Sequence, residues 1–410
     1  MLKKQKLGKK QPITKLTKYP PRKNMLQKTL FSFSVVLATL IVPNSQILGL
    51  PLTKVEVSTQ ENFSVDEGLW GDFSRQGDRK ALLTAIAHSL NYLNSPKAVK
   101  AYSRYSRTDF NLARLRRSLL RFRELLLTTN SAKELQEKVK SEFVFYQSPG
   151  NDDRGTVEFT GYFEPTYVAS RFPTKEFRYP LYRKPSNFEQ WQQPHPTRLQ
   201  LEGKNGLLRN QSILAGHEIV WLRDRLEAFL VQVQGSARLQ LTDGTTMSIT
   251  YGGSTNYPYT SVGKELVKDG VFAIEELTLP KLMAYFQANP SALDEYLPRN
   301  NRFIFFYETN GKPPNGSLGV PVTGDRSIAT DKSIMPPGAL AFIEAPIPQV
   351  MPDGTIENRI VSRYVLDQDT GSAIKGAGRV DIFLGSGKIA GERAGLINGT
   401  GKLYYLLLKE

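Results

Sequence analysis

The pattern of apolar and polar residues changes near Gly155, and this change limits the class of fold more than any other feature of the sequence. From there to the C-terminus, short runs of alternating apolar and polar residues are interrupted by Gly, Pro, Asn and Asp. Alternation with a period of two is typical of half-buried β-strands, and the interrupting residues are typical of turns. The predicted strands are 157–159, 179–182, 226–233, 237–241, 246–251, 302–308, 339–344, 360–366, 379–384 and 403–408. This pattern predicts a mainly β fold, a sandwich or a barrel.

Two segments before Gly155 have helical periodicity instead. In 80–93 and 112–126 apolar residues recur every three or four positions, which predicts amphipathic helices. The apolar stripe of the second helix consists of Leu112, Leu115, Leu119, Phe122 and Leu126. The arginines beside it, which we interpret as a solvated face, are Arg114, Arg117, Arg121 and Arg123. Shorter helices are expected near 264–268 and 279–289, and a long loop is expected at 185–210.

Most of the positive charge lies in an N-terminal leader. The formal net charge is +15, but ten of the lysines and arginines and no acidic residue precede Thr29, which leaves only +5 for the rest. Residues 31–42 are then apolar or small, and Pro43-Asn44-Ser45 follows, which is the order of a secretory signal. We expect an exported protein of the periplasm or cell envelope, translated from Met1 or Met25, whose leader is either cleaved or kept as a membrane tether. Charge confined to a leader does not predict nucleic-acid binding.

The chain contains no cysteine and only three histidines, His88, His195 and His217. The absence of cysteine excludes disulfides, a thiol nucleophile, cysteine-ligated zinc and a lipid-modified cysteine anchor. His217 is followed by Glu218 but not by the second histidine of a zinc-binding His-Glu-x-x-His pair, so no metal centre is expected. Acid and base chemistry therefore falls to carboxylates, and no cofactor is expected.

Asp381 is the most informative carboxylate, because it lies in the middle of a predicted strand. Alternation places it on one face with Arg379 and Phe383, while the residues between them point to the opposite face. A cleft lined by Phe383 would raise the pKa of Asp381 and keep part of it protonated, as a general acid requires, whereas Arg379 would lower that pKa. An exposed aspartate at a sheet edge, paired with Arg379, is the alternative that the residues leave open.

Two further motifs are ambiguous by themselves. Asp369-Thr370-Gly371-Ser372 resembles the active-site tetrapeptide of aspartic proteases, but the chain has no second copy, and an Asx-type turn explains the motif equally well. Aromatic residues cluster in segments 161–165 and 251–261, the second of which also contains Asn, Ser and Thr, and this suits either carbohydrate binding or a β core with satisfied hydroxyls.

Five separated motifs occur in a definite order along the chain. They are Gly161-Tyr162-Phe163-Glu164-Pro165, Gln232-Val233-Gln234-Gly235-Ser236-Ala237-Arg238, Asn256-Tyr257-Pro258-Tyr259-Thr260-Ser261-Val262-Gly263, Ser327-Ile328-Ala329-Thr330-Asp331, and Gln368-Asp369-Thr370-Gly371 with Lys375-Gly376 and Val380-Asp381-Ile382-Phe383. Together they resemble the membrane-bound lytic murein transglycosylase A family, from about Asp78 to the C-terminus. The resemblance includes the terminal module named for its three aspartates, here Asp331, Asp369 and Asp381.

The resemblance implies a mainly β fold with N-terminal helices, in which a six-stranded double-psi β-barrel carries an inserted second β domain. The implied division is a leader at 1–49, a helical region at 50–155, the barrel at 156–167 and 300–410, and the inserted domain at 168–299. It also implies that peptidoglycan glycan strands, the expected partner of a monomeric enzyme, lie in a groove between barrel and insert.

By the same resemblance, Asp381 is the single catalytic residue, and Asp331 and Asp369 shape the groove and orient the acid. The residues implied to bind the sugar are Tyr162, Glu164, Gln234, Ser236, Asn256 and Tyr259. The implied reaction cleaves the MurNAc-β-1,4-GlcNAc bond: Asp381 protonates the bridging oxygen and then accepts the proton of the C6 hydroxyl that closes a 1,6-anhydro ring. A non-catalytic peptidoglycan-binding protein and an aspartic-type peptidase that uses Asp369 are the alternatives.

Overall fold

The computed structural model describes residues 51–56, 64–72, 75–103 and 109–410. Everything described below belongs to the unit Ile47–Glu410. The leader expected at 1–49, and with it the choice between Met1 and Met25, lies outside the described residues. Within the described ranges, no helix has the length and apolar character needed to cross a membrane.

Six strands close into a barrel. They are β5 (Val157–Glu164), β12 (Ser327–Ala329), β13 (Leu340–Val350), β14 (Ile356–Asp369), β15 (Arg379–Ser386) and β16 (Gly399–Leu408). Their order around the ring is β5, β15, β12, β14, β13 and β16, and pairing of β16 with β5 closes it. The pairs β5–β15 and β12–β14 are parallel, and the other neighbours are antiparallel. Closure removes the free edges that an open sheet would expose.

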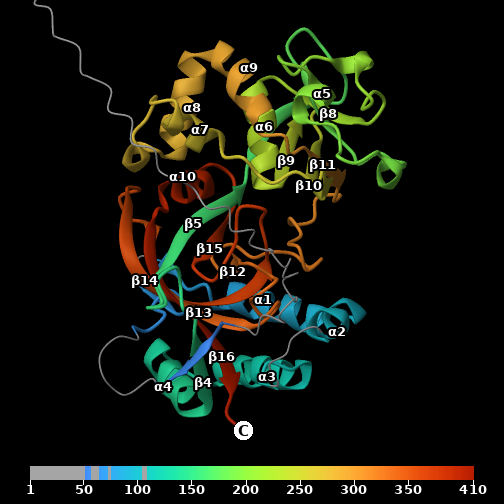
Figure 1. The fold of residues 1–410 in the computed structure, drawn as a ribbon. Helices are drawn as coiled ribbons and strands as arrows, with labels where there is room; N and C mark the ends of the chain where they lie inside the picture. Colours follow the sequence, from blue (N-terminus) through green and yellow to red (C-terminus); the bar gives the residue numbers. More distant parts are fainter. Residues whose placement is uncertain (1–50, 57–63, 73–74, 104–108) are drawn as a thin grey trace, which may run out of the picture. The chain divides into compact units, whose positions relative to one another are not determined.

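The alternation of apolar residues explains why these strands form a barrel. In β15 every second residue, Val380, Ile382 and Leu384, is buried in the barrel core. Each such side chain contributes about 1.5–3 kcal/mol when it leaves water. Two strands extend the barrel sheet beyond β16, namely β4 (Phe143–Gln147) and β1 (Thr53–Val55). The helix α10 (Lys388–Leu396) connects β15 to β16 and packs against β5 (Figure 1).

Among the described residues, four helices precede the barrel in the sequence, and the first and third of them pack directly against its strands. They are α1 (Arg79–Leu93), α2 (Pro96–Tyr102), α3 (Leu112–Thr128) and α4 (Ala132–Glu142). The apolar stripe of α3 faces the barrel, where the Phe122 ring lies 4.8 Å from the Tyr364 ring of β14. The solvated face expected for the arginines is wrong for Arg114, which is buried and donates hydrogen bonds of 3.1 Å to the Leu408 carbonyl. A guanidinium can therefore lie beside the stripe and still fasten a helix to a strand end.

A second sheet of six strands lies beyond the barrel. Its order is β11 (Ile304–Glu308), β10 (Thr246–Ser254), β9 (Ser236–Leu241), β6 (Thr166–Ser170), β8 (Glu218–Leu222) and β7 (Tyr179–Tyr182). The helices of this region are α5 (Arg198–Glu202), α6 (Arg225–Gln234), α7 (Val262–Lys268), α8 (Leu279–Ala288) and α9 (Leu293–Tyr296). Short 3₁₀ turns lie at Phe188–Gln190, Arg209–Gln211, Ile274–Glu276, Pro290–Ala292 and Leu297–Arg299, and a two-stranded ribbon pairs β2 (Gly71–Asp72) with β3 (Arg75–Gln76).

Two sequence-based expectations for this region are wrong. The segment 226–233, expected as a strand, belongs to helix α6. The Asp224 side chain caps its first turn by accepting from the Leu226 N–H, and Gly235 ends it at φ 79°. Because α6 packs against both the second sheet and the α7–α9 cluster, it is apolar on most sides and its sequence resembles a buried strand.

The boundaries 168–299 are too narrow for the second sheet. β6 begins at Thr166, directly after β5 and Pro165, and β11 extends the sheet to Glu308. β11 pairs with β10 and with no barrel strand among the described elements, so 304–308 does not belong to the barrel. The chain therefore crosses between the two sheets at Pro165 and again through the connection 309–326 between β11 and β12 (Figure 1).

A buried ion pair fastens the start of the described chain to the barrel. The Arg326 guanidinium is fully buried and donates to Asp66 at 2.5 Å and to Asp78 at 2.9 Å. Asp66 also accepts the Tyr364 N–H of β14 at 2.9 Å. Loss of the guanidinium would leave the buried Asp66 carboxylate without its cation, whereas Asp78 would keep Arg363 at 3.7 Å, and an unpaired buried charge is more costly than never having buried the pair.

We expect Arg326→Leu to lower the free energy of unfolding by about 3–5 kcal/mol in urea denaturation, because it strands buried charge. The matched control is Arg359→Leu, which removes the half-exposed ion pair with Glu357 and should cost less than about 1 kcal/mol. Equal losses of unfolding free energy in the two variants would show that the buried ion pair contributes no more to stability than the half-exposed one.

Candidate active site

Asp381 lies in the interior of the barrel sheet. β15 runs between β12 and β5, so Asp381 is opposite Ala329 on one side and Thr160 on the other. The adjacent residues Val380 and Ile382 point into the barrel core, and the Asp381 side chain therefore points out of the barrel. The alternative of an exposed aspartate at a sheet edge is wrong.

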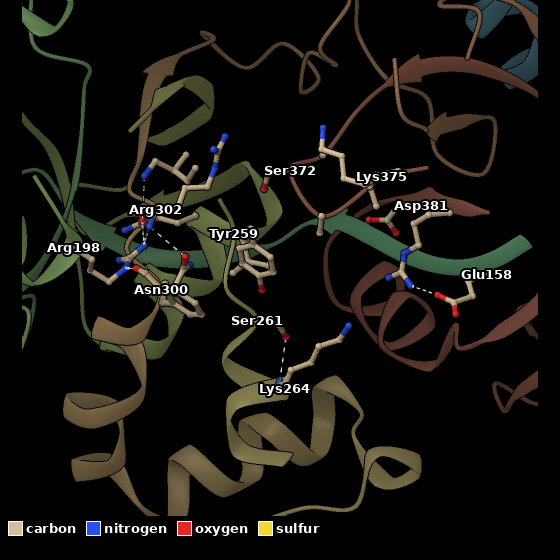
Figure 2. A pocket seen from close by; sticks show the side chains of 18 of the residues that line it. Glu158, Arg198, Tyr259, Ser261, Lys264, Asn300, Arg302, Ser372, Lys375 and Asp381 are labelled. Carbon is tan, nitrogen blue, oxygen red and sulfur yellow. Dashed lines mark hydrogen bonds and ion pairs between the residues drawn. The ribbon is translucent and has the colours of Figure 1, made fainter. Parts of the chain in front are cut away.

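Burial controls the ionisation of Asp381. It raises the pKa of this carboxyl to about 6, although a hydrogen bond from Thr160 and the charge of Arg379 act in the opposite direction. The Thr160 hydroxyl donates to Asp381 Oδ1 at 3.0 Å. Arg379 forms its ion pair with Glu158, at 2.9 Å (Figure 2). The balance between burial and Arg379, which the residues alone leave open, is thus decided by burial.

Asp369 lies beside Asp381 but has a different environment. Its Oδ1 accepts the backbone N–H groups of Ser317 at 2.7 Å and Thr370 at 2.8 Å, and its Oδ2 accepts the Tyr162 hydroxyl at 2.8 Å. Burial raises the pKa of Asp369 despite these hydrogen bonds. The charge of Asp369 in turn contributes to the raised pKa of Asp381. Asp369 is therefore held in place and acts on its neighbour electrostatically.

Asp331 holds the loop between β14 and β15. It is buried, and its carboxylate accepts from the Ser333 hydroxyl at 2.6 Å and from the Gly376 N–H at 2.9 Å. Although burial acts in the opposite direction, these hydrogen bonds and the charge of Lys375 lower the pKa of Asp331. Among the described residues, Asp331 lines neither of the cavities at Asp381, so its effect on the site passes through the loop.

Two cavities meet at Asp381 and form the lobes of one groove between the barrel and the second sheet. The tyrosine lobe has a volume of about 850 Å³, and its lining includes Tyr162, Gln234, Ser236, Tyr251, Asn256, Tyr257, Tyr307 and Asp369. The basic lobe has a volume of about 690 Å³, and its lining includes Glu158, Arg198, Tyr259, Lys264, Arg302, Lys375 and Arg379 (Figure 2). Asp381 lines both lobes. The carboxyl with the raised pKa therefore lies where the lining of the groove changes from tyrosines and amides to basic side chains.

The structure brings together most of the residues that the sequence analysis assigned to sugar binding. Tyr162, Gln234, Ser236 and Asn256 line the tyrosine lobe, and Tyr259 lines the basic lobe. Gln234, at the end of α6, also accepts the Phe163 N–H of β5 at 3.0 Å, which links the second sheet to the barrel across the groove. Asn256 is held by the Gln193 side chain and by His195, which accepts its backbone N–H at 3.1 Å.

Glu164 does not reach the groove. It is fully buried, and among the described residues it lines neither lobe. Its carboxylate accepts from the Ser386 hydroxyl at 2.5 Å and from Arg238 at 3.3 Å. The expected contact between Glu164 and substrate is therefore wrong, because its carboxylate is enclosed at the end of β5 and bound by Ser386 of β15 and Arg238 of β9.

Sequence reasoning missed several residues that the groove contains. Thr160 lies two positions before Tyr162 on the same face of β5, so strand alternation could have identified it once the tyrosine was assigned. Lys264 and Arg302 carry no motif signal and become visible only when α7 and β11 are placed beside the barrel. Within the described residues, no group of three or more histidine, cysteine or carboxylate side chains is placed to hold a metal ion.

Comparison with known proteins agrees with this geometry. The family model described as the MltA specific insert domain matches residues 158–307, and the model described as the 3D domain matches residues 326–407. Membrane-bound lytic murein transglycosylase A of Escherichia coli (strain K12) is 32% identical over 263 residues, which cover 64% of this chain and 68% of that protein.

Two solved structures share the fold. The membrane-bound lytic murein transglycosylase from Agrobacterium tumefaciens superimposes with a TM-score of 0.64 at 28% identity, over 81% of this chain and 93% of that chain. The crystal structure of E. coli MltA with bound chitohexaose gives a TM-score of 0.67 at 24% identity, over 88% of this chain and 95% of that chain. The two matched domains and the identity to the E. coli enzyme establish that the chain belongs to the membrane-bound lytic murein transglycosylase A family.

Proposed function

We propose that this chain cleaves the MurNAc-β-1,4-GlcNAc bond of peptidoglycan and forms 1,6-anhydro-MurNAc, with Asp381 as the only acid and base. Family membership supports peptidoglycan transglycosylase activity. The observation that carries the mechanism is the position of Asp381: a carboxyl with its pKa raised to about 6 on a central strand, at the junction of two lobes.

Asp381 differs from the other two aspartates in having an oxygen available. Both oxygens of Asp369 and both oxygens of Asp331 accept hydrogen bonds. Of Asp381, Oδ1 accepts from Thr160, and Oδ2 has no hydrogen-bond partner among the described residues. A carboxyl that must give a proton to a glycosidic oxygen needs such a free oxygen in the groove.

In the first step, protonated Asp381 donates to the bridging oxygen, and the C1–O bond breaks with positive charge developing at C1 of MurNAc. Asp381 is then a carboxylate beside that charge and stabilises it electrostatically. In the second step, the carboxylate accepts the proton of the C6 hydroxyl of the same sugar, whose oxygen bonds to C1. Hydrolases need a second carboxylate to attack or to activate water, whereas here ring closure within one sugar replaces it.

The surrounding residues support the two roles of Asp381, first as an acid and then as a base. The Asp369 charge favours the protonated form of Asp381, and the Thr160 hydrogen bond favours the carboxylate. We assign sugar contacts to Tyr162, Gln234, Ser236 and Asn256 in the tyrosine lobe and to Tyr259 in the basic lobe. The flat faces and polar rims of such side chains suit pyranose rings.

The finer description of fold and location belongs to the same proposal. Two parallel strand pairs within a closed six-stranded ring support a double-psi barrel, interrupted between β5 and β12 by the inserted domain. We propose that the protein acts as a monomer in the periplasm or cell envelope, to which the basic and apolar residues of 1–49 direct or tether it.

We expect Asp381→Asn to lower the release of soluble muropeptides from purified sacculi by at least about 100-fold, because the amide can neither donate nor accept the proton. Mass spectrometry of the wild-type digest should show ends lighter by one water than reducing ends. Asp369→Asn keeps the acid and should lose less activity. Reducing ends alone would contradict ring closure, and retained activity in Asp381→Asn would contradict the assignment of the acid.

We expect kcat/KM of the wild-type protein to fall as the pH rises above about 6, because Asp381 must be protonated in the free enzyme. Thr160→Val removes a hydrogen bond that stabilises the carboxylate, so the pKa of Asp381 rises and this limb of the pH profile moves to higher pH. Thr160→Ser keeps the hydroxyl and should keep the wild-type profile. An unchanged limb in Thr160→Val, or a shift to lower pH, would show that the profile reports another group.

A further inference from the structure

The two lobes of the groove differ in charge. Five cationic side chains line the basic lobe: Arg198, Lys264, Arg302, Lys375 and Arg379. Its carboxyl groups are only Glu158, which forms an ion pair with Arg379, and the catalytic Asp381. The tyrosine lobe shares Arg302 and Lys375 but adds Asp369 and a lining of tyrosines and amides. The excess of positive charge is therefore concentrated on one side of Asp381.

The cations of the basic lobe are not all engaged within the protein. Arg198 is buried, its donors bind the Asn300 and Arg302 carbonyls and the Gln232 side chain, and its charge is paired with Glu202 at 3.3 Å. Arg302 donates to the Tyr257 carbonyl at 2.9 Å, which satisfies hydrogen bonding but does not neutralise the charge. Both arginines line the wall of the lobe, and Arg302, which has no ion-pair partner among the described residues, makes the potential there more positive.

Lys264 and Lys375 are exposed, and neither ammonium has an ion-pair or hydrogen-bond partner among the described residues. They approach the lobe from different domains, Lys264 from α7 of the insert and Lys375 from the loop between β14 and β15 (Figure 2). Their backbones are nevertheless fixed. The Ser261 hydroxyl accepts the Lys264 N–H at 3.3 Å, and Asp331 accepts the N–H of Gly376, next to Lys375, at 2.9 Å.

We propose that the basic lobe binds a carboxylate on the lactyl substituent of the MurNAc beside the scissile bond, with Lys264 and Lys375 as its cationic partners. This inference rests on the proposed function. The sugar rings of peptidoglycan are uncharged, and the anionic groups of the glycan strand hang from the lactyl ether of MurNAc. On a strand without peptide the lactyl carboxyl is itself free, whereas on a strand with peptide the carboxylates belong to the stem.

The position of the lobe favours a group close to the cleaved bond. Asp381, Lys375 and Arg302 line both lobes, so an anion held where the basic lobe begins lies close to the linkage that Asp381 protonates. Both lysines line the cavity in which a negative group on that side would lie. Ion pairs at partly exposed sites are individually weak and are screened by salt, so the contribution should depend on ionic strength.

The test is a binding comparison in the full chain carrying Asp381→Asn, which prevents turnover. Three probes are titrated calorimetrically: chitohexaose, which has no carboxylate, peptide-free glycan with free lactyl carboxylates, and glycan with intact peptide stems. We expect the additional double change Lys264→Ala and Lys375→Ala to raise Kd for carboxylate-bearing glycan about 10-fold at low salt, and to leave chitohexaose within about twofold. Raising NaCl from about 50 mM to about 300 mM should reproduce part of the loss without mutation.

Two controls isolate the charge. Lys268→Ala removes an exposed lysine from the same helix α7 that does not line the lobe, and it should leave all three affinities unchanged. Lys264→Arg with Lys375→Arg keeps both charges and should retain most of the affinity. Loss on the peptide-free probe alone assigns the site to the lactyl carboxylate, and loss on the stem-bearing probe alone assigns it to the peptide.

An equal loss for chitohexaose, or no loss for either carboxylate-bearing probe, would overturn the inference. Neither result touches the proposed function, which depends on release of anhydro products by the protein with Asp381 intact. Failure of that activity assay would instead remove the enzyme mechanism, whatever the binding measurements show.

Discussion

The parallel pairing of β5 with β15 is the constraint on which the site depends. It closes the barrel, and its register places Thr160 and Tyr162 opposite Asp381 and Phe383. A Cβ at Gly161 would lie 2.9 Å from the Ala394 Cα, so only glycine allows α10 to pack against β5 at this point. Because β5 leads through Pro165 directly into β6, the same strand that buries the acid also positions the sheet forming the opposite wall of the groove.

Three aspartates with the same side chain acquire three roles through their surroundings. Asp331 accepts hydrogen bonds with both oxygens and fixes a loop. Asp369 is also held at both oxygens, and its remaining influence is its charge. Only Asp381 combines burial with an unengaged oxygen, so burial raises its pKa to about 6 while the oxygen faces the groove. In the mechanism that we propose, the three aspartates are thus an acid, an electrostatic neighbour and a structural carboxylate, and no second catalytic base is needed.

The sequence predicts the type of an element well where only one of its faces is buried. It fails where an element is buried on most sides, and it cannot predict contacts that depend on the register between strands. The alternation at 379–384 identified β15 and the outward face of Asp381. The apolar sequence of 226–233 predicts a strand because α6 is apolar on most sides. Asp224 and Gly235, which cap the two ends of α6, are residues typical of helix caps. The motif that contains Glu164 lies next to the groove, but the sequence does not show that Glu164 itself is buried. Only the fold shows that its carboxylate is enclosed and bound by Ser386 and Arg238. The Thr160–Asp381 hydrogen bond depends on register between strands 221 residues apart and has no local signature.

Because the two lobes differ in charge, a glycan strand that carries carboxylates would bind the groove in a preferred orientation and register. A β-1,4 glycan presents similar ring faces and hydroxyls along its length, so tyrosines and amides alone would hold it in more than one register. A carboxylate partner on one side of Asp381 distinguishes MurNAc, which carries the lactyl group, from GlcNAc, which does not. Register matters for the chemistry because ring closure requires the acid to protonate the oxygen on C1 of MurNAc, with the C6 hydroxyl of that sugar within reach. In this proposal, the excess of positive charge on the side of the basic lobe contributes to the choice of bond as well as to affinity.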